Sequence, residues 1–210
     1  MDIIKQMEWR YAVKKFDPEK TLSPEQLNKL KEAFNLTATS YGLQPIKLVV
    51  LKNRKVQEQL VAHSYQQLQV AQASHVLVLC IEKAIDDTYI VDYFERVRQV
   101  RGTSQAILDP FKKDLVKTFS KKSMAEIKQW ATNQAYLAMG NLLTVCAAEQ
   151  IDACPMEGFV PSAYDEVLGL ASQGLTSVLV LPVGYRAGDD MFSDLKKVRR
   201  PLTESIIEIS

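Results

Sequence analysis

Short apolar runs alternate along this chain with longer segments of helical periodicity. Three runs, at residues 46–51, 75–81 and 177–183, are rich in Val, Leu and Ile and follow polar or turn residues. Continuous apolar runs of this length are typical of strands that are buried on both faces. We therefore expect these three segments to form the core of a sheet.

A fourth apolar run, residues 205–209, lies at the C-terminus. A lone strand in this position has to find an exposed sheet edge with which to pair. The pattern predicts a terminal strand whose partner edge belongs to this chain or to another subunit.

Two helices have complete N-terminal signals. Residues 23–26 (Ser-Pro-Glu-Gln) combine a capping hydroxyl, a proline at the first helical position and a Gln three residues after the cap. Ser123 and Glu126 repeat the capping pattern before the longest periodic stretch, which runs to about Gln150. Residues 135–148 are apolar nearly all round, so we expect the sheet to cover one side of this helix and a second body, such as a partner subunit, the other.

Three further segments lie between these elements. Residues 54–71 and 86–101 have helical periodicity and predict helices. Residues 102–122 mix Gly, Pro, Lys and aromatic side chains without a clear period. We interpret this last segment as a mobile connection.

Composition and charge narrow the class of protein. The chain has 210 residues, of which 47% are hydrophobic and 24% charged, as in ordinary globular proteins rather than disordered, collagen-like or disulfide-rich ones. Its 26 Lys and Arg residues almost balance 25 Asp and Glu residues, so no nucleic-acid partner is expected. No linker or internal repeat divides the sequence, and we expect one domain over residues 1–210.

No membrane or export signal is evident. The longest apolar stretch, residues 135–148, is interrupted by Gly140, Asn141 and Thr144, so no stretch reaches the roughly 20 apolar residues that span a bilayer. Residues 1–5 lack a basic segment followed by an apolar run and a cleavage site. The expectation is a cytoplasmic protein without a membrane partner.

The cysteines and histidines do not form a metal-binding pattern. Three cysteines occur without a C-x-x-C pair, and the two histidines, His63 and His75, stand twelve residues apart. Cys80 and Cys146 lie in apolar runs and are expected to pack in the core. We expect no disulfide framework and no metal site.

Common catalytic signatures are missing as well. The sequence has no G-x-G-x-x-G, no G-x-x-x-x-G-K-[ST] and no G-x-S-x-G, which removes support for a Rossmann site, a P-loop and a nucleophile elbow. Cations instead gather in residues 10–16 and 196–201. Such groups bind phosphate in some proteins and are simply solvated in others, and each run alone favours the second use.

Two polar loops could approach a ligand. Residues 39–45 (Thr-Ser-Tyr-Gly-Leu-Gln-Pro) offer hydroxyls, an amide and a glycine, and residues 155–159 (Pro-Met-Glu-Gly-Phe) bracket two residues with Pro and Gly. The second loop predicts a rigid bend whose backbone N–H groups can point at an acceptor atom. Each loop taken alone is equally a plain turn.

In their order along the chain, these pieces resemble the FMN-dependent nitroreductase family, in particular its oxygen-insensitive NAD(P)H nitroreductase and dihydropteridine reductase branch. The resemblance covers nearly the whole chain. It rests on residues 1–4, 10–17, 39–40, 44–45, 73–76, 134–141, 155–159, 182–184 and 197–201.

The resemblance implies an α+β fold, with a central, mostly antiparallel sheet flanked by helices. It also implies a homodimer with two FMN molecules in clefts at the subunit interface. The C-terminal segment, from about residue 203 to 210, would extend onto the partner subunit and add a strand there.

Site residues follow by position from the same resemblance. Arg10, Lys197 and Arg199 resemble the clamp on the FMN phosphate, and Lys14 resembles the cation near flavin N1 and O2. The amides of Glu157 and Gly158 would face N5 and O4, and the partner subunit would contribute Thr39, Ser40 and Gln134. The complete implied FMN set is Arg10, Tyr11, Ala12, Lys14, Thr39, Ser40, Gly42, Gln66, Gln69, Gln134, Pro155, Met156, Glu157, Gly158, Lys197 and Arg199.

This chain departs from the family pattern at several of these positions. Tyr11 and Ala12 stand where well-known members have a His and a Ser, so only main-chain contacts transfer to Ala12. Gly42 replaces a frequent Asn, and Gln66 and Gln69 replace an Asn and a Lys that can meet the ring. With one cation fewer, Lys14 would carry more of the stabilisation of reduced flavin.

The implied activity is hydride transfer from NADH or NADPH to flavin N5 and then, in a ping-pong cycle, to a nitroaromatic, quinone or pterin acceptor, with no side-chain nucleophile. Tyr41, Phe111 and Phe119 could stack on this small planar acceptor or could be core or rim residues. Two alternatives stay open: an FMN storage or sensor protein without turnover, and a flavin-free protein whose 135–148 helix serves only dimerisation.

Overall fold

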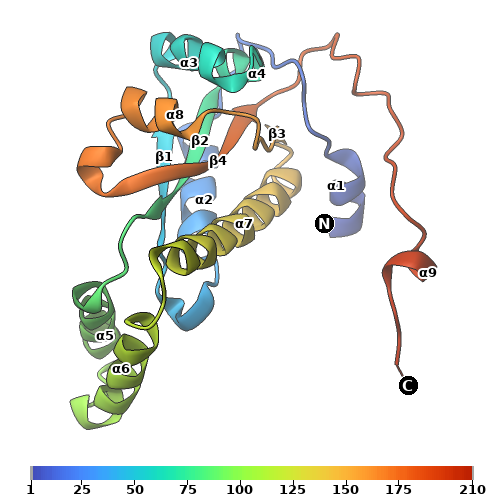
Figure 1. Ribbon diagram of the computed structural model, residues 1–210. Helices are drawn as coiled ribbons and strands as arrows, with labels where there is room; N and C mark the ends of the chain where they lie inside the picture. The colour runs from blue at the N-terminus through green and yellow to red at the C-terminus, as the bar shows by residue number, and fades with distance from the viewer. Residues whose placement is uncertain (1, 210) are drawn as a thin grey trace.

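The computed structural model describes residues 2–209 and contains one four-stranded antiparallel sheet (Figure 1). The strand order is β1 (Ile46–Leu51), β2 (His75–Glu82), β4 (Leu175–Gly184) and β3 (Asp152–Ala153). The three strands predicted from apolar runs are confirmed, with β4 longer than expected. The two-residue β3 was not predicted, because its sequence carries no run long enough to signal a strand.

Helices cover the sheet and continue beyond it (Figure 1). Their bounds are α1 (Ile3–Trp9), α2 (Pro24–Asn35), α3 (Arg54–Val61), α4 (Gln69–Gln72), α5 (Asp87–Arg101), α6 (Gln105–Phe119), α7 (Met124–Ala148), α8 (Pro161–Val167) and α9 (Leu202–Ser205). Short 3₁₀ turns occupy Ser40–Gly42, Ala62–Ser64 and Ala171–Gln173. Both predicted capping boxes, at Ser23 and Ser123, are present.

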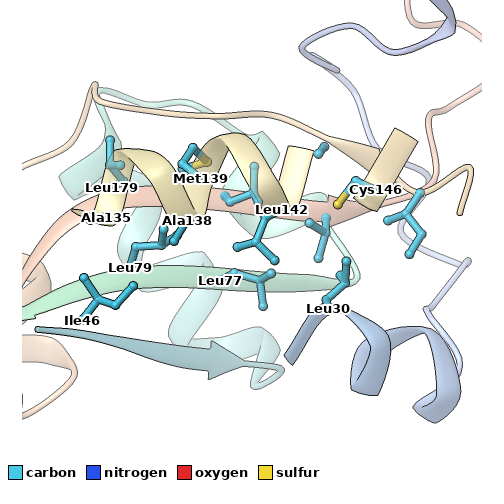
Figure 2. Packing of buried hydrophobic residues seen from close by; sticks show 14 of the residues in the cluster. Leu30, Ile46, Leu77, Leu79, Ala135, Ala138, Met139, Leu142, Cys146 and Leu179 are labelled. Carbon is cyan, nitrogen blue, oxygen red and sulfur yellow. The ribbon is translucent and has the colours of Figure 1, made fainter. Parts of the chain in front are cut away.

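The two faces of the sheet have separate cores because side chains alternate along each strand. On β2, Leu77 and Leu79 face α7 and α2, and Figure 2 shows them beneath the buried side of α7 with Leu142. Val76 and Val78 point the other way, into the core that contains α3 and α8. The α+β class with a flanked antiparallel sheet is therefore confirmed.

Helix α7 is buried on one side only. Ala135 and Leu142 are fully buried against the sheet, whereas Leu137 on the opposite side is 56% exposed and Tyr136 is also exposed. A Cβ added at Gly140 would meet no atom within 4 Å. The apolar outer side thus has no cover within residues 2–209. The second body that was expected to cover it is not part of this described chain and stays a prediction.

The interpretation of residues 102–122 as a mobile connection was wrong. Gly102 ends α5 in the left-handed conformation (φ 66°), and residues 105–119 then form α6, which packs antiparallel to α5. Apolar residues recur at positions 107, 111, 115 and 119 of this helix, but Pro110 and the surrounding lysines obscured that spacing. Figure 1 shows the α5–α6 hairpin projecting from the body.

The helix predicted over residues 54–71 is interrupted. It begins as α3 and resumes as α4, with Tyr65 and Gln66 between them in the left-handed region (φ 51° and 61°). A single helical period therefore does not run through the segment. The break turns residues 65–67 toward the 155–158 loop.

Residues 206–209 do not pair with a strand of this chain, at least among the residues described. They follow α9 at the end of a segment, residues 191–209, that is exposed throughout and leaves the body after β4 (Figure 1). No helix in the described part of the chain is long and apolar enough to span a bilayer.

Candidate functional site

Cations from opposite ends of the chain meet beyond α1. Arg10 follows α1, and its main-chain carbonyl accepts a hydrogen bond from Nζ of Lys197, 187 positions later. Partial burial and nearby Arg199 lower the pKa of the Arg10 guanidinium. Partial desolvation, Arg10 and Arg199 likewise lower the pKa of Lys197. The three residues implied for a phosphate clamp therefore lie together and repel one another.

We define the cation cluster as Arg10, Lys197 and Arg199; the carboxylate of Glu8 lies close enough to raise the pKa of Lys197 slightly but forms no ion pair with it. Across residues 2–209, none of its members forms an ion pair. A fourth cation, Arg186, lies close enough to contribute to the lowered pKa of Lys197. Grouped cations without a counterion are suited to bind an anion such as phosphate.

Arg186 is held rigidly, and nothing in the sequence pattern singled it out. Its guanidinium binds the buried carboxylate of Asp152 through Nε and Nη2 (2.8 and 2.6 Å), and its main-chain N–H donates to the same carboxylate (2.7 Å). The guanidinium also lies between the rings of Trp9 and Tyr11, 4.4 and 4.5 Å from their centroids. Arg186 therefore fixes the end of α1 and the start of the following segment.

The segment after Arg10 runs along β3 and ends at Lys14. Ala12 forms a parallel bridge with Ala153, and Val13 N–H donates to the Ala153 carbonyl (3.3 Å). The main-chain N–H of Lys14 donates to the carboxylate of Asp190 (2.9 Å), as does the hydroxyl of Tyr11 (2.9 Å). The Tyr11 ring therefore contacts Arg186, and the Tyr11 hydroxyl binds Asp190.

Lys14 lies near the 155–158 loop. Burial raises the pKa of the Cys154 thiol, and Lys14 and Arg10 both lie close enough to oppose that rise. The loop itself is anchored by Met156, which exchanges two main-chain hydrogen bonds with Val180 (2.8 and 3.1 Å). Lys14 and Arg10 therefore both lie near Cys154, the residue that precedes the loop.

The amides implied to face the flavin are free. Within the described chain, the N–H groups of Glu157 and Gly158 donate no hydrogen bond to another group. The Gly158 carbonyl accepts from Nε2 of Gln67 (2.9 Å), and the Glu157 carboxylate accepts from the hydroxyl of Tyr136 on α7 (2.7 Å). The loop is therefore fixed by its other groups while these two donors remain available.

The two glutamines named from the sequence lie at this loop in different settings. Gln69 is buried beside Cys154, whereas Gln66 is exposed and left-handed. Their neighbour Gln67, which the sequence did not single out, makes the direct bond to Gly158. A Cβ on Gly158 would lie 3.0 Å from the Gln67 amide, so the Gln67 side chain would have to shift slightly to admit one.

A second polar group forms on the other side of α7. Oε1 of Gln134 accepts a hydrogen bond from the Ser40 N–H (2.8 Å), and Oγ1 of Thr39 accepts one from the Gln44 N–H (3.0 Å). Gln134 and Tyr136 are two positions apart on an α-helix, a rotation of about 200°, so their side chains point to opposite sides of α7. The group at Thr39, Ser40 and Gln134 therefore lies across α7 from the Glu157 loop of the same chain.

Gly42 is required by its surroundings. Its φ is 73°, and a Cβ at this position would lie 2.7 Å from the hydroxyl of Tyr93. The Tyr93 hydroxyl thus fills the space that a side chain such as Asn would need. The positive φ and this contact both favour glycine at position 42.

The three aromatic residues named for the acceptor divide into two kinds. Tyr41 and Phe111 are exposed and line a cavity of about 500 Å³ on the α5–α6 hairpin, together with Arg101. Phe119 is 2% exposed and packs edge-on against Trp130, with ring centroids 5.0 Å apart. Phe119 is therefore a core residue, which is one of the two alternatives that the sequence left open for it.

The cysteines are all reduced and buried. Burial raises the pKa of the Cys80 and Cys146 thiols to about 12, so neither is a thiolate near neutral pH. Among residues 2–209, no three His, Cys, Asp or Glu side chains gather as a metal-binding group would.

Four residues of the site were missed from the sequence: Gln67, Asp152, Arg186 and Asp190. Each acts through contacts with positions far along the chain, as in the pair of Asp190 with Lys14, separated by 176 positions. Single-sequence spacing carries no signal for such contacts. The only available hint was charge in an otherwise apolar setting, at Asp152, the first residue of β3.

The chain is similar to known proteins over its whole length. The family model described as Nitroreductase family matches residues 7–185. The oxygen-insensitive NAD(P)H nitroreductase of Salmonella typhimurium is 32% identical, and the alignment covers 100% of both chains. That of Enterobacter cloacae is 30% identical over 99% of this chain and 100% of its own.

Solved structures have the same fold. The Bacillus subtilis protein ydfN superposes with a TM-score of 0.88 at 21% identity, covering 99% of each chain. A structure from Exiguobacterium sibiricum, solved in complex with FMN, superposes with a TM-score of 0.84 at 17% identity, covering 100% of this chain and 98% of the other. With the match of the family model and of full-length relatives, the chain belongs to the nitroreductase family.

Proposed function

We propose that this protein is an FMN-dependent NAD(P)H oxidoreductase. The observation that carries the proposal is the cation cluster, three positive groups held together from opposite ends of the chain, none of which forms an ion pair within residues 2–209. A phosphate monoester would supply the missing negative charge. The NAD(P)H nitroreductase relatives and the FMN-bound neighbour support the choice of ligand.

The residues present fit FMN along its length. The cation cluster would hold the phosphate, and Lys14 would lie toward the ring, since it adjoins the loop that carries the free amides of Glu157 and Gly158. Those amides would donate hydrogen bonds to ring acceptors, and the ammonium of Lys14 would stabilise negative charge. Bound FMN supplies the redox chemistry, accepting a hydride from NAD(P)H and passing it to the acceptor.

Two half-sites on each chain favour a homodimer. The first half-site contains the cation cluster and the 155–158 loop, and the second contains Ser40 and Gln134 across α7. Arg10 lies near Cys146, which is twelve residues, or about 18 Å, along α7 from Gln134. We infer that the first half-site of one subunit meets the second half-site of its partner to complete each FMN site.

The uncovered surfaces suit this association. The outer side of α7 presents Leu137, and the edge strand β1 lies beside a cavity of about 710 Å³ that contains Phe34 and Leu48 with Lys31 and Lys47. Residues 203–209 combine isoleucines with two glutamates and are exposed in the described part of the chain. We infer that this segment reaches the partner subunit and pairs with its β1 edge.

The acceptor would bind beside the α5–α6 hairpin. The cavity there is lined by Tyr41 and Phe111 and is mostly apolar, which suits a small planar molecule such as a nitroaromatic, a quinone or a pterin. No nucleic acid takes part in this reaction.

Comparing FMN with riboflavin, which lacks the phosphate, tests the proposal. We expect apo-protein to bind FMN at least about tenfold more tightly than riboflavin in a fluorescence titration, because charge-assisted phosphate contacts are lost with riboflavin. The double variant Lys197→Met/Arg199→Met should abolish the preference and leave riboflavin binding unchanged. Equal affinity of the wild-type protein for both flavins would refute the clamp, and binding of neither would refute the function.

A further inference from the structure

One buried carboxylate touches the segment that carries Lys14. Asp190 is 3% exposed and, within residues 2–209, forms no ion pair. Its Oδ2 accepts hydrogen bonds from the Tyr11 hydroxyl (2.9 Å), the Lys14 N–H (2.9 Å) and the Lys15 N–H (3.3 Å). Its Oδ1 accepts one from the Phe192 N–H (3.1 Å).

These bonds need an ionised acceptor. Burial alone would raise the pKa of Asp190, but the N–H donors of Lys14 and Phe192 and the Tyr11 hydroxyl outweigh burial and hold the pKa below its usual value. Four donors converge on one side chain, as expected for a carboxylate that accepts and never donates. Charge-assisted hydrogen bonds of this kind are stronger than neutral ones.

The carboxylate is itself fixed by a rigid neighbour. The ring of Tyr11 lies under the Arg186 guanidinium, which is bound to Asp152 at β3. Asp190 is thereby connected through Tyr11 and Arg186 to the edge of the sheet. The main-chain N–H groups of Lys14 and Lys15 both donate to this one carboxylate, which is linked in this way to β3.

We propose that Asp190 is a positioning residue for Lys14, holding the main chain at residues 14–15 so that the Lys14 ammonium is aimed at the negative charge that FMN gains on reduction. This inference rests on the proposed function. Asp190 is not among the residues expected to contact FMN. We infer that it influences the reduction potential of the flavin through Lys14.

The sign of the change in potential separates positioning from a direct effect of charge. Neutralising a buried carboxylate that acted through space would favour added negative charge on the flavin and raise its reduction potential. Releasing Lys14 would withdraw a cation from the reduced flavin and lower the potential. Asp190→Asn keeps the size of the side chain but presents an NH₂ group where one oxygen accepted, so at least one bond is lost.

The test compares Asp190→Asn with Asp194→Asn, an exposed carboxylate four residues later whose one hydrogen bond is a contact of 3.3 Å with Ser193. In FMN-free protein, hydrogen exchange of the Lys14 and Lys15 amides directly reports their hydrogen bonds to Asp190. In FMN-bound protein, the reduction potential is measured by dye equilibration, and the affinity for FMN by titration. Lys14→Met is combined with each variant to measure coupling.

We expect Asp190→Asn to speed exchange at both amides, to lower the potential and to weaken FMN binding about tenfold. Lys14→Met should lower the potential strongly in the wild-type background and much less in the Asp190→Asn background. Tyr11→Phe, which removes one bond and keeps the carboxylate, should shift the potential by a smaller amount in the same direction. Asp194→Asn should change none of these quantities.

A potential that rises or stays constant in Asp190→Asn would overturn the proposal, as would full additivity with Lys14→Met. If Asp190→Asn does not fold, the same comparison is made with Tyr11→Phe. Full additivity of the potential shifts of Tyr11→Phe and Lys14→Met would also overturn the proposal. A wild-type protein that fails to bind FMN refutes the proposed function instead. Faster amide exchange with unchanged flavin properties refutes the inference alone.

Discussion

Lys197 donates a hydrogen bond from its ammonium group to the main-chain carbonyl of Arg10, joining positions 187 residues apart. This contact brings two cations side by side at the end of α1, with Arg199 close to both. Partial burial, followed by the repulsion between neighbouring cations, lowers the pKa of both Arg10 and Lys197, so the folded state disfavours their charged forms. Such an arrangement is typical of a binding site rather than of a stabilising surface.

The cation cluster should therefore oppose stability while it supports binding. A lowered pKa means that folding disfavours the charged form of Lys197, so the repulsion is present at neutral pH and disappears only as the pH rises through the folded-state pKa. Arg199→Met should leave the FMN-free protein equally or slightly more stable, by less than about 0.5 kcal/mol in urea denaturation. The same variant should weaken FMN binding. Clear destabilisation without weaker binding would show that Arg199 is structural.

Gly42 tests the fit between the Ser40–Gly42 turn and α5. Gly42→Ala places a Cβ at positive φ and 2.7 Å from the Tyr93 hydroxyl, so we expect the free energy of unfolding to fall by about 1–3 kcal/mol. Tyr93→Phe in the same chain removes the clashing oxygen and should recover part of the loss. Gly140→Ala, where a Cβ meets no atom within 4 Å, is the matched control and should not destabilise the subunit fold. No recovery with Tyr93→Phe would contradict the steric account.

The outer side of α7 tests the predicted homodimer. Leu137 is exposed in the single chain, and Leu137→Glu should convert the two-chain species to single chains in sedimentation velocity, because it would bury a charge at the interface. Leu36→Glu alters an equally apolar residue at the end of α2 and should leave the dimer intact. A wild-type protein that sediments as single chains, or a Leu137→Glu variant that sediments as the wild type does, would contradict this arrangement.

Protonation of Asp190 in acid should weaken its hydrogen bonds to the main chain at residues 14–15. The folded-state pKa of Asp190 lies below the ordinary value, so its contribution to stability is complete above the unfolded pKa, about 3.9, and is lost as the pH falls through the folded value. Asp190→Asn should lower the free energy of unfolding by about 1–3 kcal/mol at pH 7, and this difference should shrink below about pH 4. Urea denaturation at a series of pH values measures it. A difference that is constant with pH would show that the carboxylate charge is irrelevant.

The sequence predicted the parts of this fold whose signals are local. The capping boxes at Ser23 and Ser123 and the apolar runs of β1, β2 and β4 each depend on neighbouring residues, and each prediction is confirmed. Local reasoning was misled where two signals compete, as at Pro110, which obscured the apolar spacing of α6. It also missed the break after α3, because Tyr65 and Gln66 adopt a left-handed conformation that their residue types do not signal.

The site was predictable only in part, for a different reason. The resemblance to the family named Arg10, Lys197 and Arg199, and the fold brings them together. Asp190 and Arg186 escaped because their roles depend on contacts with the segment after α1, which no spacing in one sequence reveals. Completion of each site by a partner subunit stays a prediction, as does the strand at residues 205–209.

The central claim is most directly tested by the visible absorption spectrum of FMN-bound protein before and after anaerobic addition of NADH and, separately, of NADPH. The account predicts flavin bands from FMN that bleach with at least one nucleotide and return when a nitroaromatic, quinone or pterin acceptor is added. Bands that persist with both nucleotides would contradict the oxidoreductase and favour a protein that stores or senses FMN. A colourless protein that takes up no added FMN would contradict the flavin site itself and leave dimerisation as the remaining use of α7.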